Sequence, residues 1–185
     1  RLLEAAVTEP DQPIGRLNIL ASEERQKILV ESNPHGKEIE QETLPALFEE
    51  QVSKYPEKIA AVYEEESVTY AELNKRANQL AHLLMDKGVG AEQFVALAIP
   101  RSLDMVVGLL AVLKAGAAYL PLDPDYPIDR LTFMLQDAKP SCVLTSSSVA
   151  ASLPGIHSQQ IVMDDPSTLV ELSRYSSENP LDSDR

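Results

Sequence analysis

The chain has 185 residues, enough for one domain with a substantial core, and 44% of them are hydrophobic. Aromatic residues make up only 5% and tryptophan is absent, so the core must consist mainly of leucine, valine, isoleucine and alanine. The formal net charge of −13 argues against nucleic acid or an anionic membrane as a partner, because both are bound through clusters of lysine and arginine. The ordinary interpretation of such a charge is solubility.

The cysteine content and the apolar runs favour a cytoplasmic protein. The single cysteine, Cys142, allows no disulfide within the chain, which suits a reducing compartment. The N-terminus has no apolar run of the signal-peptide type. The longest apolar region, residues 103–113, is too short to span a bilayer. The chain does not begin with methionine, and we expect it to be a piece of a longer protein.

Residues 1–42 are predicted to be a connector. The first letters, RLLEAAV, are typical of the end of a helix, and the proline- and glycine-rich run TEPDQPIGRL is typical of irregular chain. A short helix is expected over SEERQKILVES, with Ser22 as its N-cap and with Glu23 and Glu24 placed favourably in the first turn. The run NPHGKEIEQE then interrupts the pattern.

A new unit is predicted to begin at Thr43. The run TLPALFEEQVSK has helical spacing, KIAAVY is typical of a short strand, and residues 67–68 are expected to pair with that strand. Thr69 and Glu72 form a T-x-x-E capping box at the start of a longer helix. Gly88 stands where the left-handed C-terminal cap of that helix belongs.

Strands and helices alternate through the following residues. FVALAI, residues 94–99, is typical of a strand buried on both faces, and further strands are expected at AAYL, CVLT and QIVM, residues 117–120, 142–145 and 160–163. Helices are expected from Ser102 to Lys114 and from Pro127 to Ala138, and a loop from Asp164 onward. The alternation predicts an α/β fold: a mostly parallel, doubly wound sheet with flanking helices, preceded by an irregular linker with a short helix.

Motifs for phosphate binding are weak. Residues 88–90, Gly-Val-Gly, lack a third glycine and precede a strand, whereas a dinucleotide-binding loop follows one. The run Thr145-Ser146-Ser147-Ser148 does follow a strand and offers hydroxyls. Neither glycine nor lysine accompanies it, so we do not expect it to hold phosphate.

The histidines and the cysteine form no metal or nucleophile pattern. His35, His82 and His157 lie far apart in the sequence. His82 points away from the apolar face of its helix, so a solvated histidine is expected. Cys142 lies in an apolar strand and is typical of an inert buried thiol. The sequence therefore predicts no catalytic, cofactor-binding or metal-binding residue in this chain.

The stretch LKAGAAYLPLDPDYPIDRL, residues 113–131, holds the remaining candidates for chemistry. Its three prolines fix three backbone angles within seven residues. Asp123, Asp125 and Asp129 would each need a partner in a cleft to act as an acid or a base, and the sequence names none. Capping and the helix dipole account for such aspartates at a helix N-terminus. We therefore predict a rigid corner of the scaffold.

Two stretches resemble the first core motifs of adenylation domains from nonribosomal peptide synthetases. VTYAELNKRANQLAHLL, residues 68–84, is similar to L-T-Y-x-E-L, and residues 113–138 are similar to L-K-A-G-x-A-Y-L-V-P-L-D. The run IPRSLDMVVGLLAVLKAG between them also fits. LASEERQKIL, TLPALFEEQ and YPEKIAAV resemble the connector that joins an upstream condensation domain to the adenylation domain.

The resemblance implies a role for the parent protein. Residues 1–42 are then a condensation-domain tail and linker, and residues 43–185 are an incomplete N-terminal subdomain of an adenylation domain. The parent is expected to be a cytoplasmic, multidomain ligase of antibiotic biosynthesis. It would use ATP and Mg²⁺ to convert an amino acid into an aminoacyl-adenylate and load it onto phosphopantetheine. The phosphate-binding loop and later motifs of the family would follow Arg185, so this chain is expected to be scaffold without catalytic residues or a cofactor of its own.

The expected partners are the remainder of the adenylation domain, an upstream condensation domain and a downstream peptidyl carrier domain. Two alternatives remain: a non-catalytic interaction module, and a fragment of an acyl-CoA ligase, which shares the fold. Acyl-CoA ligases and luciferases usually lack the Y-L-P-L-D-P-x-Y-P-x-x-R form found at residues 119–130. The identity of the amino acid lies out of reach, because the specificity pocket of the family is downstream.

Overall fold

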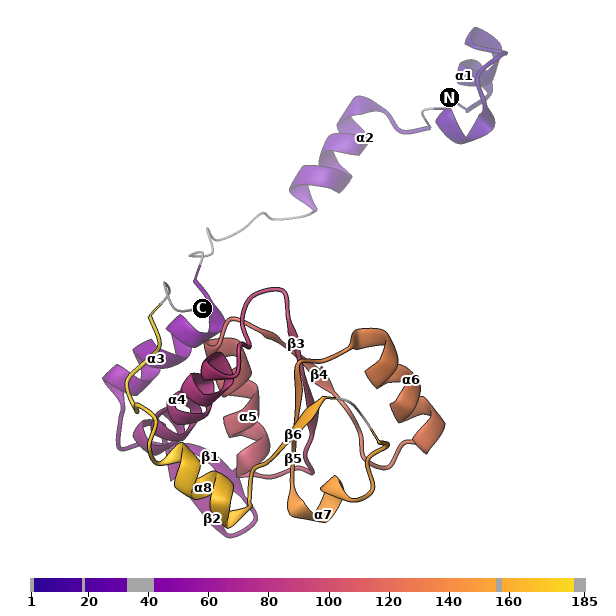
Figure 1. Ribbon diagram of the computed structural model, residues 1–185. Helices are drawn as coiled ribbons and strands as arrows, with labels where there is room; N and C mark the ends of the chain where they lie inside the picture. The colour runs from indigo at the N-terminus through magenta and orange to yellow at the C-terminus, as the bar shows by residue number, and fades with distance from the viewer. Residues whose placement is uncertain (1, 18, 33–41, 156–157, 182–185) are drawn as a thin grey trace. The chain divides into compact units, whose positions relative to one another are not determined.

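A computed structural model describes residues 2–17, 19–32, 42–155 and 158–181 (Figure 1). The chain divides into two compact units, which comprise residues 1–41 and residues 42–185. The strands of the described chain all belong to the second unit.

The first unit consists of short helical segments without a core of its own. α2 begins after Ala21, whose backbone N–H donates to the Glu24 carboxylate at 2.9 Å. The prediction of Ser22 as the N-cap is therefore wrong by one residue, because the cap comes from a glutamate that reaches back. None of the described helical residues of this unit is buried; the segments are α1 (Leu2–Thr8), η1 (Ile14–Arg16), α2 (Ser22–Gln26) and η2 (Lys27–Glu31).

A helix and a hairpin open the second unit. α3 (Leu44–Lys54) is capped by Thr43, whose Oγ1 accepts a hydrogen bond from the backbone N–H of Ala46 at 3.3 Å. β1 (Ile59–Tyr63) and β2 (Glu66–Thr69) form an antiparallel pair. The predicted short strand and its pairing partner are thus confirmed.

α4 (Tyr70–Asp86) has both ends where the sequence predicts them. Thr69 Oγ1 accepts from the backbone N–H of Glu72 at 3.2 Å, which satisfies one of the free donors at the start of the helix. Gly88 has a φ of +81° and closes the last turn. The apolar face of α4 lies in the core, with Leu80 and Leu84 fully buried.

A parallel sheet of four strands forms the centre of the second unit. In space the order is β4-β3-β5-β6, and neighbouring strands run parallel. The chain adds β4 on one side of β3 and then places β5 on the other side, so the sheet is doubly wound. The predicted α/β fold is thus confirmed, with β3 (Phe94–Ala98), β4 (Ala118–Pro121), β5 (Cys142–Thr145) and β6 (Gln159–Val162).

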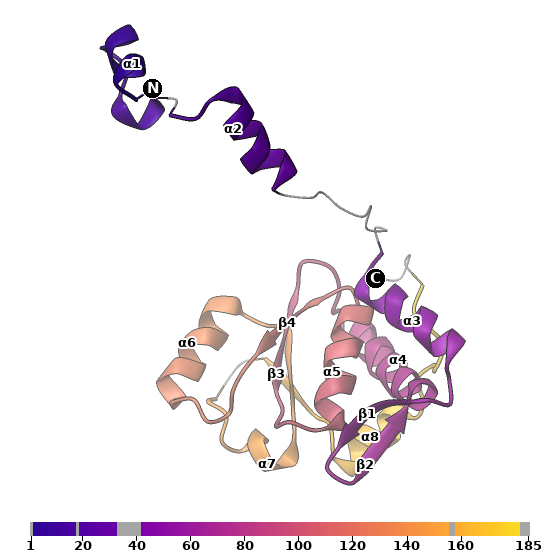
Figure 2. The same ribbon diagram turned by 180° about the vertical axis from the view of Figure 1, so that it is seen from behind.

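Helices cover both faces of this sheet (Figures 1 and 2). Val95 and Leu97 of β3 pack into one core with α4 and α5 (Leu103–Lys114). Ala96 and Ala98 pack into a second core on the opposite face. Alternate residues of a strand point to opposite faces, so β3 contributes to both cores. The helices of the second face are α6 (Ile128–Ala138) and α7 (Ser147–Ala150).

α5 is buried or half-buried along its whole length, as its apolar sequence predicts. Ser102 Oγ accepts from the backbone N–H of Met105 at 3.2 Å, and Gly116 ends the helix with a φ of +76°. Gly108 faces the sheet, and a Cβ there would lie in van der Waals contact with the Leu97 side chain, 3.4 Å from its Cδ2. Among the described helices, none is both long and apolar enough to cross a membrane.

α8 (Pro166–Leu172) lies where the sequence predicts a loop. Asp165 caps it, because its Oδ1 accepts from the backbone N–H of Ser167 at 2.8 Å. The expectation of a loop from Asp164 onward is therefore wrong for this segment. None of the residues of α8 is fully buried, so its hydrophobic pattern is weak and easily overlooked.

Candidate functional site

The first candidate site lies at the carboxyl ends of the central strands, where the direction in which the sheet is wound reverses. In open α/β sheets, ligands bind outside the carboxyl ends of the strands at the point where the strand order reverses. Here that point lies between β3 and β5. Arg101 and Ser102 follow β3, and the serines at residues 146–148 follow β5.

The serine run after β5 makes local contacts. Thr145 Oγ1 is buried and donates to the carbonyl oxygen of Ala98 at 3.0 Å, which ties β5 to β3. The backbone N–H and the hydroxyl of Ser147 donate to the two Asp164 carboxylate oxygens at 2.7 and 2.5 Å. These hydrogen bonds hold the pKa of the Asp164 carboxyl below its usual value. A carboxylate at this position repels a phosphate.

The aspartates of residues 113–131 form a corner of the scaffold. Asp123 Oδ1 accepts from the backbone N–H of Asp125 at 3.0 Å, and the Asp123 carbonyl oxygen accepts from the N–H of Tyr126 at 3.0 Å. The Arg130 guanidinium lies 4.3 Å from the centroid of the Tyr126 ring. Asp129 is in the first turn of α6, and all three aspartates are exposed. Asp123 thus folds a turn, as a rigid corner requires.

Cys142 is buried in β5. Its residue is only 2% exposed, and burial raises the pKa of the thiol to about 11. The thiolate is therefore scarce at neutral pH, which agrees with the prediction of an inert thiol. Among the described residues, groups of three or more histidines, cysteines and carboxylates placed to hold a metal ion do not occur. His35 and His157 lie outside the described residues.

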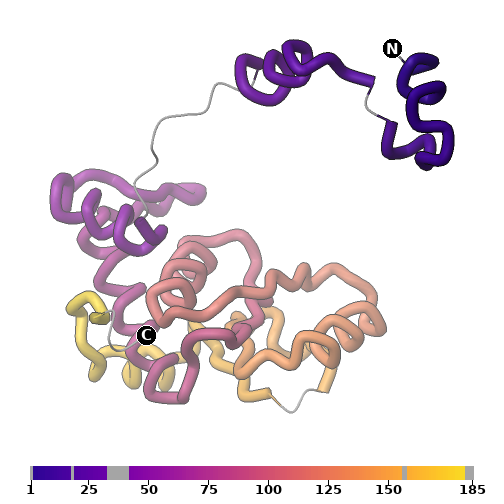
Figure 3. The backbone as a smooth tube through the Cα atoms, turned by 90° about the horizontal axis from the view of Figure 1, so that it is seen from above, coloured from indigo at the N-terminus to yellow at the C-terminus, as the bar shows by residue number. Residues whose placement is uncertain are grey.

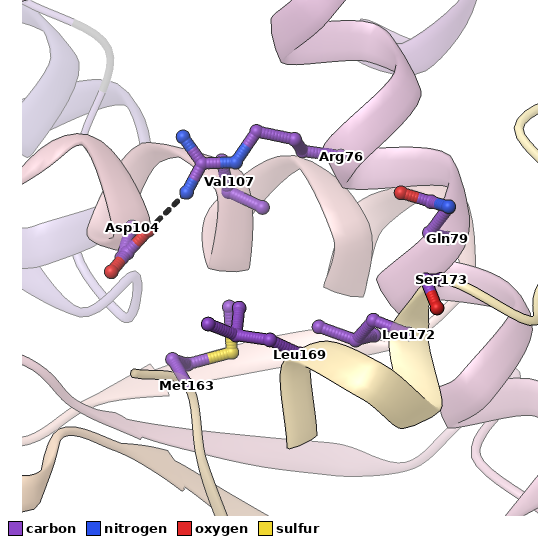
Figure 4. A pocket seen from close by; sticks show the side chains of 8 residues that line it. All are labelled: Arg76, Gln79, Asp104, Val107, Met163, Leu169, Leu172 and Ser173. Atoms are coloured by element: carbon purple, nitrogen blue, oxygen red, sulfur yellow. Dashed lines mark hydrogen bonds and ion pairs between the residues drawn. The ribbon is translucent and has the colours of Figure 1, made fainter. Parts of the chain in front are cut away.

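A small cavity lies under α8 (Figure 4). Its volume is about 110 Å³, which is room for only a few water molecules. Its apolar wall is formed by Val107, Met163, Leu169 and Leu172. Arg76 pairs with Asp104 at the same cavity, so the guanidinium charge is already neutralised. Gln79 and Ser173 complete the lining. This set lacks a nucleophile with an adjacent base.

Lys114 is the only charged side chain that is buried among the described residues, with an exposed fraction of 0%. It pairs with the carboxylate of Glu49 on α3, and its Nζ lies 3.4 Å from the Asn179 Oδ1. The Phe48 ring centroid is 5.9 Å from the same ammonium group. No local motif in the sequence marks this site. The one sequence feature that points to it is a lysine, Lys114, at the end of a mostly apolar helix.

A row of polar side chains on α4 contacts the end of the described chain. We call Asn74, Asn78, His82 and Asp86 the polar stripe, and residues 175–181 the C-terminal strap. His82, predicted to be a solvated histidine off the apolar face, has one contact that the prediction did not include. The residue is half-buried, and its Nε2 hydrogen-bonds the carbonyl oxygen of Glu178 at 3.0 Å. In Figure 3 the yellow part of the described chain, which comprises α8 and the strap, lies beside the purple and magenta helices.

Comparison with known proteins identifies the family. Residues 48–184 match the family described as AMP-binding enzyme. The whole chain is 52% identical over 186 aligned residues to a dimodular nonribosomal peptide synthase of Bacillus subtilis. It is 41% identical over 169 residues, 90% of the chain, to tyrocidine synthase 3 of Brevibacillus parabrevis. The chain spans only 8% and 3% of the lengths of these two curated relatives.

Solved structures share the fold. The nonribosomal peptide synthetase FmoA3 is similar over 97% of this chain and 19% of its own length, with a TM-score of 0.80 and 22% identity. The N-terminal subdomain of NpsA from Klebsiella oxytoca is similar over 80% of this chain and 36% of its own, with a TM-score of 0.66 and 21% identity. The chain therefore belongs to the AMP-binding enzyme family. Within that family it is part of an adenylation domain of the nonribosomal peptide synthetase type.

Proposed function

We propose that this chain is the scaffold-forming first part of an adenylation domain whose whole activates an amino acid. The parent protein joins the amino acid carboxylate to the AMP of ATP, releases pyrophosphate and passes the aminoacyl group to a phosphopantetheine thiol. The observation that carries this proposal is the 52% identity to a dimodular nonribosomal peptide synthase along the entire chain. We also propose a cytoplasmic location, in agreement with the lone, buried Cys142.

The residues described here do not fit ATP or Mg²⁺ by themselves. Mg²⁺ prefers carboxylate oxygens and water, and the described chain offers no cluster of such groups. The serine run at the reversal point of the sheet faces the Asp164 carboxylate, which disfavours a phosphate. We therefore assign to this chain no residue that acts on ATP, and the atoms that do so must come from the remainder of the domain.

The expected domain division remains part of the proposal. Residues 1–42 would link an upstream condensation domain to the adenylation domain, and residues 43–185 would begin the adenylation domain. Two facts support this: the chain divides into units at residues 41 and 42, and the apolar side chains of the first unit, such as Ile14 and Val7, are exposed. An artificially fused adenylation–PCP di-domain from Klebsiella oxytoca shares the fold, which supports a downstream carrier domain as a partner.

The proposal is tested by amino-acid-dependent exchange of labelled pyrophosphate into ATP. The whole parent protein is assayed with each of the common amino acids, and the 185-residue chain is assayed beside it. We expect exchange by the parent with one or a few amino acids, and none by the 185-residue chain. A parent protein whose carrier serine is replaced serves as the control, because it keeps the exchange and loses the loading step.

Three outcomes would contradict the proposal. Exchange by the 185-residue chain alone would show that it holds catalytic residues. Formation of acyl-CoA from fatty or aryl acids by the parent, without a response to amino acids, would favour the acyl-CoA ligase alternative. A natural chain that ends at Arg185 and binds another protein would favour the interaction module.

A further inference from the structure

The polar stripe places one side chain on each turn of α4. Asn74, Asn78, His82 and Asp86 are spaced four residues apart, so they lie along one face of the helix. Each contacts the segment that follows α8. Tyr175 Oη donates to the Asp86 carboxylate at 2.9 Å, and Asn78 Nδ2 donates to the Ser177 carbonyl oxygen at 2.7 Å.

The two ends of the stripe give the direction of the strap. Asn74 at one end contacts Asn179, Asp86 at the other end contacts Tyr175, and Asn78 and His82 contact Ser177 and Glu178 between them. The strap therefore runs antiparallel to the helix. A slip of the strap would break the pairs that use the side chains of Asn179 and Tyr175, so these two residues fix the position of the strap along α4.

Asn179 is the node at which the stripe meets the buried lysine. Its Oδ1 accepts hydrogen bonds from Asn74 Nδ2 and Asn78 Nδ2, both at 2.9 Å, and from Lys114 Nζ at 3.4 Å. Three donors from two helices thus converge on one oxygen. The side-chain oxygens of both α4 asparagines are buried without a hydrogen-bond partner in the described structure. The NH₂ groups of Asn74 and Asn78 therefore donate to the strap, while the side-chain oxygens of the same two residues accept no hydrogen bond in the described structure.

Apolar contacts hold the two ends of the strap. Tyr175 packs against the core that contains α4 and α5, as does Leu172 of α8 just before the strap, and Pro180 is buried. Between its two ends the strap contacts α4 through hydrogen bonds, which require particular directions of donor and acceptor. Buried ion pairs such as Lys114 with Glu49 contribute little net stability compared with apolar residues, and in some proteins such pairs specify one arrangement.

We propose that the stripe, Lys114 and Asn179 form a latch that fixes where the chain leaves this part of the domain. The latch would thereby align the remainder of the adenylation domain, and Asn179, Asn78 and Lys114 would be positioning residues for adenylation. The catalytic part of this inference depends on the proposed function. The latch itself depends only on the contacts described above.

The experiment compares Asn179→Leu with Asn179→Asp in the whole parent protein. Asn179→Leu removes the acceptor oxygen that the three donors share. Asn179→Asp keeps an oxygen at that position and adds a charge opposite to that of Lys114, so it should preserve the latch. Glu178→Gln is the matched control within the strap, because the hydrogen bond at Glu178 uses its backbone carbonyl oxygen.

Two measurements are made on each variant: deuterium uptake by peptides across the protein, and the kcat and KM of pyrophosphate exchange. Uptake reports the latch through the backbone N–H groups of Tyr175 and Glu178, which donate to the Leu172 carbonyl oxygen and to Ser176 Oγ and depend on the strap staying in place. For Asn179→Leu we expect uptake at these amides to rise about tenfold, with β3 and β5 unchanged. We expect kcat to fall about tenfold with the KM for the amino acid unchanged, because the specificity pocket is not touched. Asn179→Asp and Glu178→Gln should resemble the wild type in both measurements.

Three results would overturn the inference. Unchanged uptake in Asn179→Leu would mean that no latch exists. Uptake that rises equally in the strap and in β3 would indicate general destabilisation. A local rise in uptake with unchanged kcat would leave the strap without a positioning role. If the wild-type parent shows no pyrophosphate exchange, the proposed function fails, and deuterium uptake alone decides whether the latch exists.

Discussion

Lys114 has no contact with solvent, so its ammonium group depends on the protein for hydrogen bonds. Replacing it with methionine keeps the apolar stem and leaves the Glu49 carboxylate without this partner. We predict that Lys114→Met lowers the free energy of unfolding by about 3–5 kcal/mol, because breaking a buried pair leaves a charge uncompensated. Urea denaturation of the chain measures this.

Lys54 supplies the matched control for that substitution. It also pairs with a glutamate, Glu50, but both side chains are about half exposed. Solvent screens such a pair, so Lys54→Met should change the stability little. If Lys54→Met and Lys114→Met have equal effects, burial is not the reason for the importance of Lys114.

Cys142 gives a prediction about reactivity and pH. Because burial raises the pKa of its thiol from 9.0 to about 11, iodoacetamide at pH 8 should modify the native protein far more slowly than the urea-unfolded protein. The neutral thiol is favoured in the folded state. Its contribution, about 2–3 kcal/mol, is therefore fully present below pH 9 and is lost as the pH rises toward 11.

The control for the pH effect is Cys142→Ala, which cannot ionise. Its stability between pH 9 and 11 should fall less steeply than that of the wild type when both are followed by urea denaturation. Parallel curves for the two proteins, or native alkylation as fast as in urea, would contradict the assignment of a buried, inert thiol.

At the scale of elements, two glycines after α4 allow the energetic effect of one backbone angle to be measured by itself. A Cβ added to Gly88 or to Gly90 would meet no atom within 4 Å, so neither substitution by alanine causes a clash. Only Gly88 has a left-handed φ, +81°. Gly88→Ala should therefore lower the free energy of unfolding by about 1 kcal/mol, whereas Gly90→Ala should not. Equal stabilities of the two variants in thermal or urea denaturation would refute this explanation.

The helices that the sequence predicts well are those with local signals at their ends. α4 has Thr69 before it and Gly88 after it, and α5 has Ser102 and Gly116 in the same places. These signals act within four residues, so they are visible in the sequence. α8 has a capping aspartate as well, but it buries no residue completely, and without a clear apolar face its pattern is weak.

The polar stripe could not be predicted from local patterns. Asn74 and Asn78 look like ordinary solvated residues on the polar face of a helix. Their partner, Asn179, lies 105 and 101 residues further along the chain. The scaffold role of Asp123, in contrast, was predictable, because its hydrogen bonds reach only two or three residues. Sequence patterns therefore located the corner and missed the latch.

At the scale of the whole molecule, the net charge of −13 predicts a dependence on salt. Like charges repel one another within a compact fold, and ions screen this repulsion over a Debye length of about 10 Å at 0.1 M. We expect the Tm of the chain to rise by a few degrees between 20 and 500 mM NaCl, because a change of about 1 kcal/mol in stability shifts the Tm by that amount. A Tm that falls would mean that attractive ion pairs outweigh the repulsion; thermal unfolding followed by circular dichroism distinguishes the two.

The contact between Asn74 and Asn179 also orders events during synthesis. Because 105 residues separate the two, α4 emerges from the ribosome well before its partner exists. At about 5–20 residues per second, the ribosome needs roughly 5–20 s to make the intervening chain. Throughout that interval the asparagines of α4 are paired with water. The helix therefore changes partners once, from solvent to strap, and that exchange marks the moment at which this part of the nascent protein has been completed.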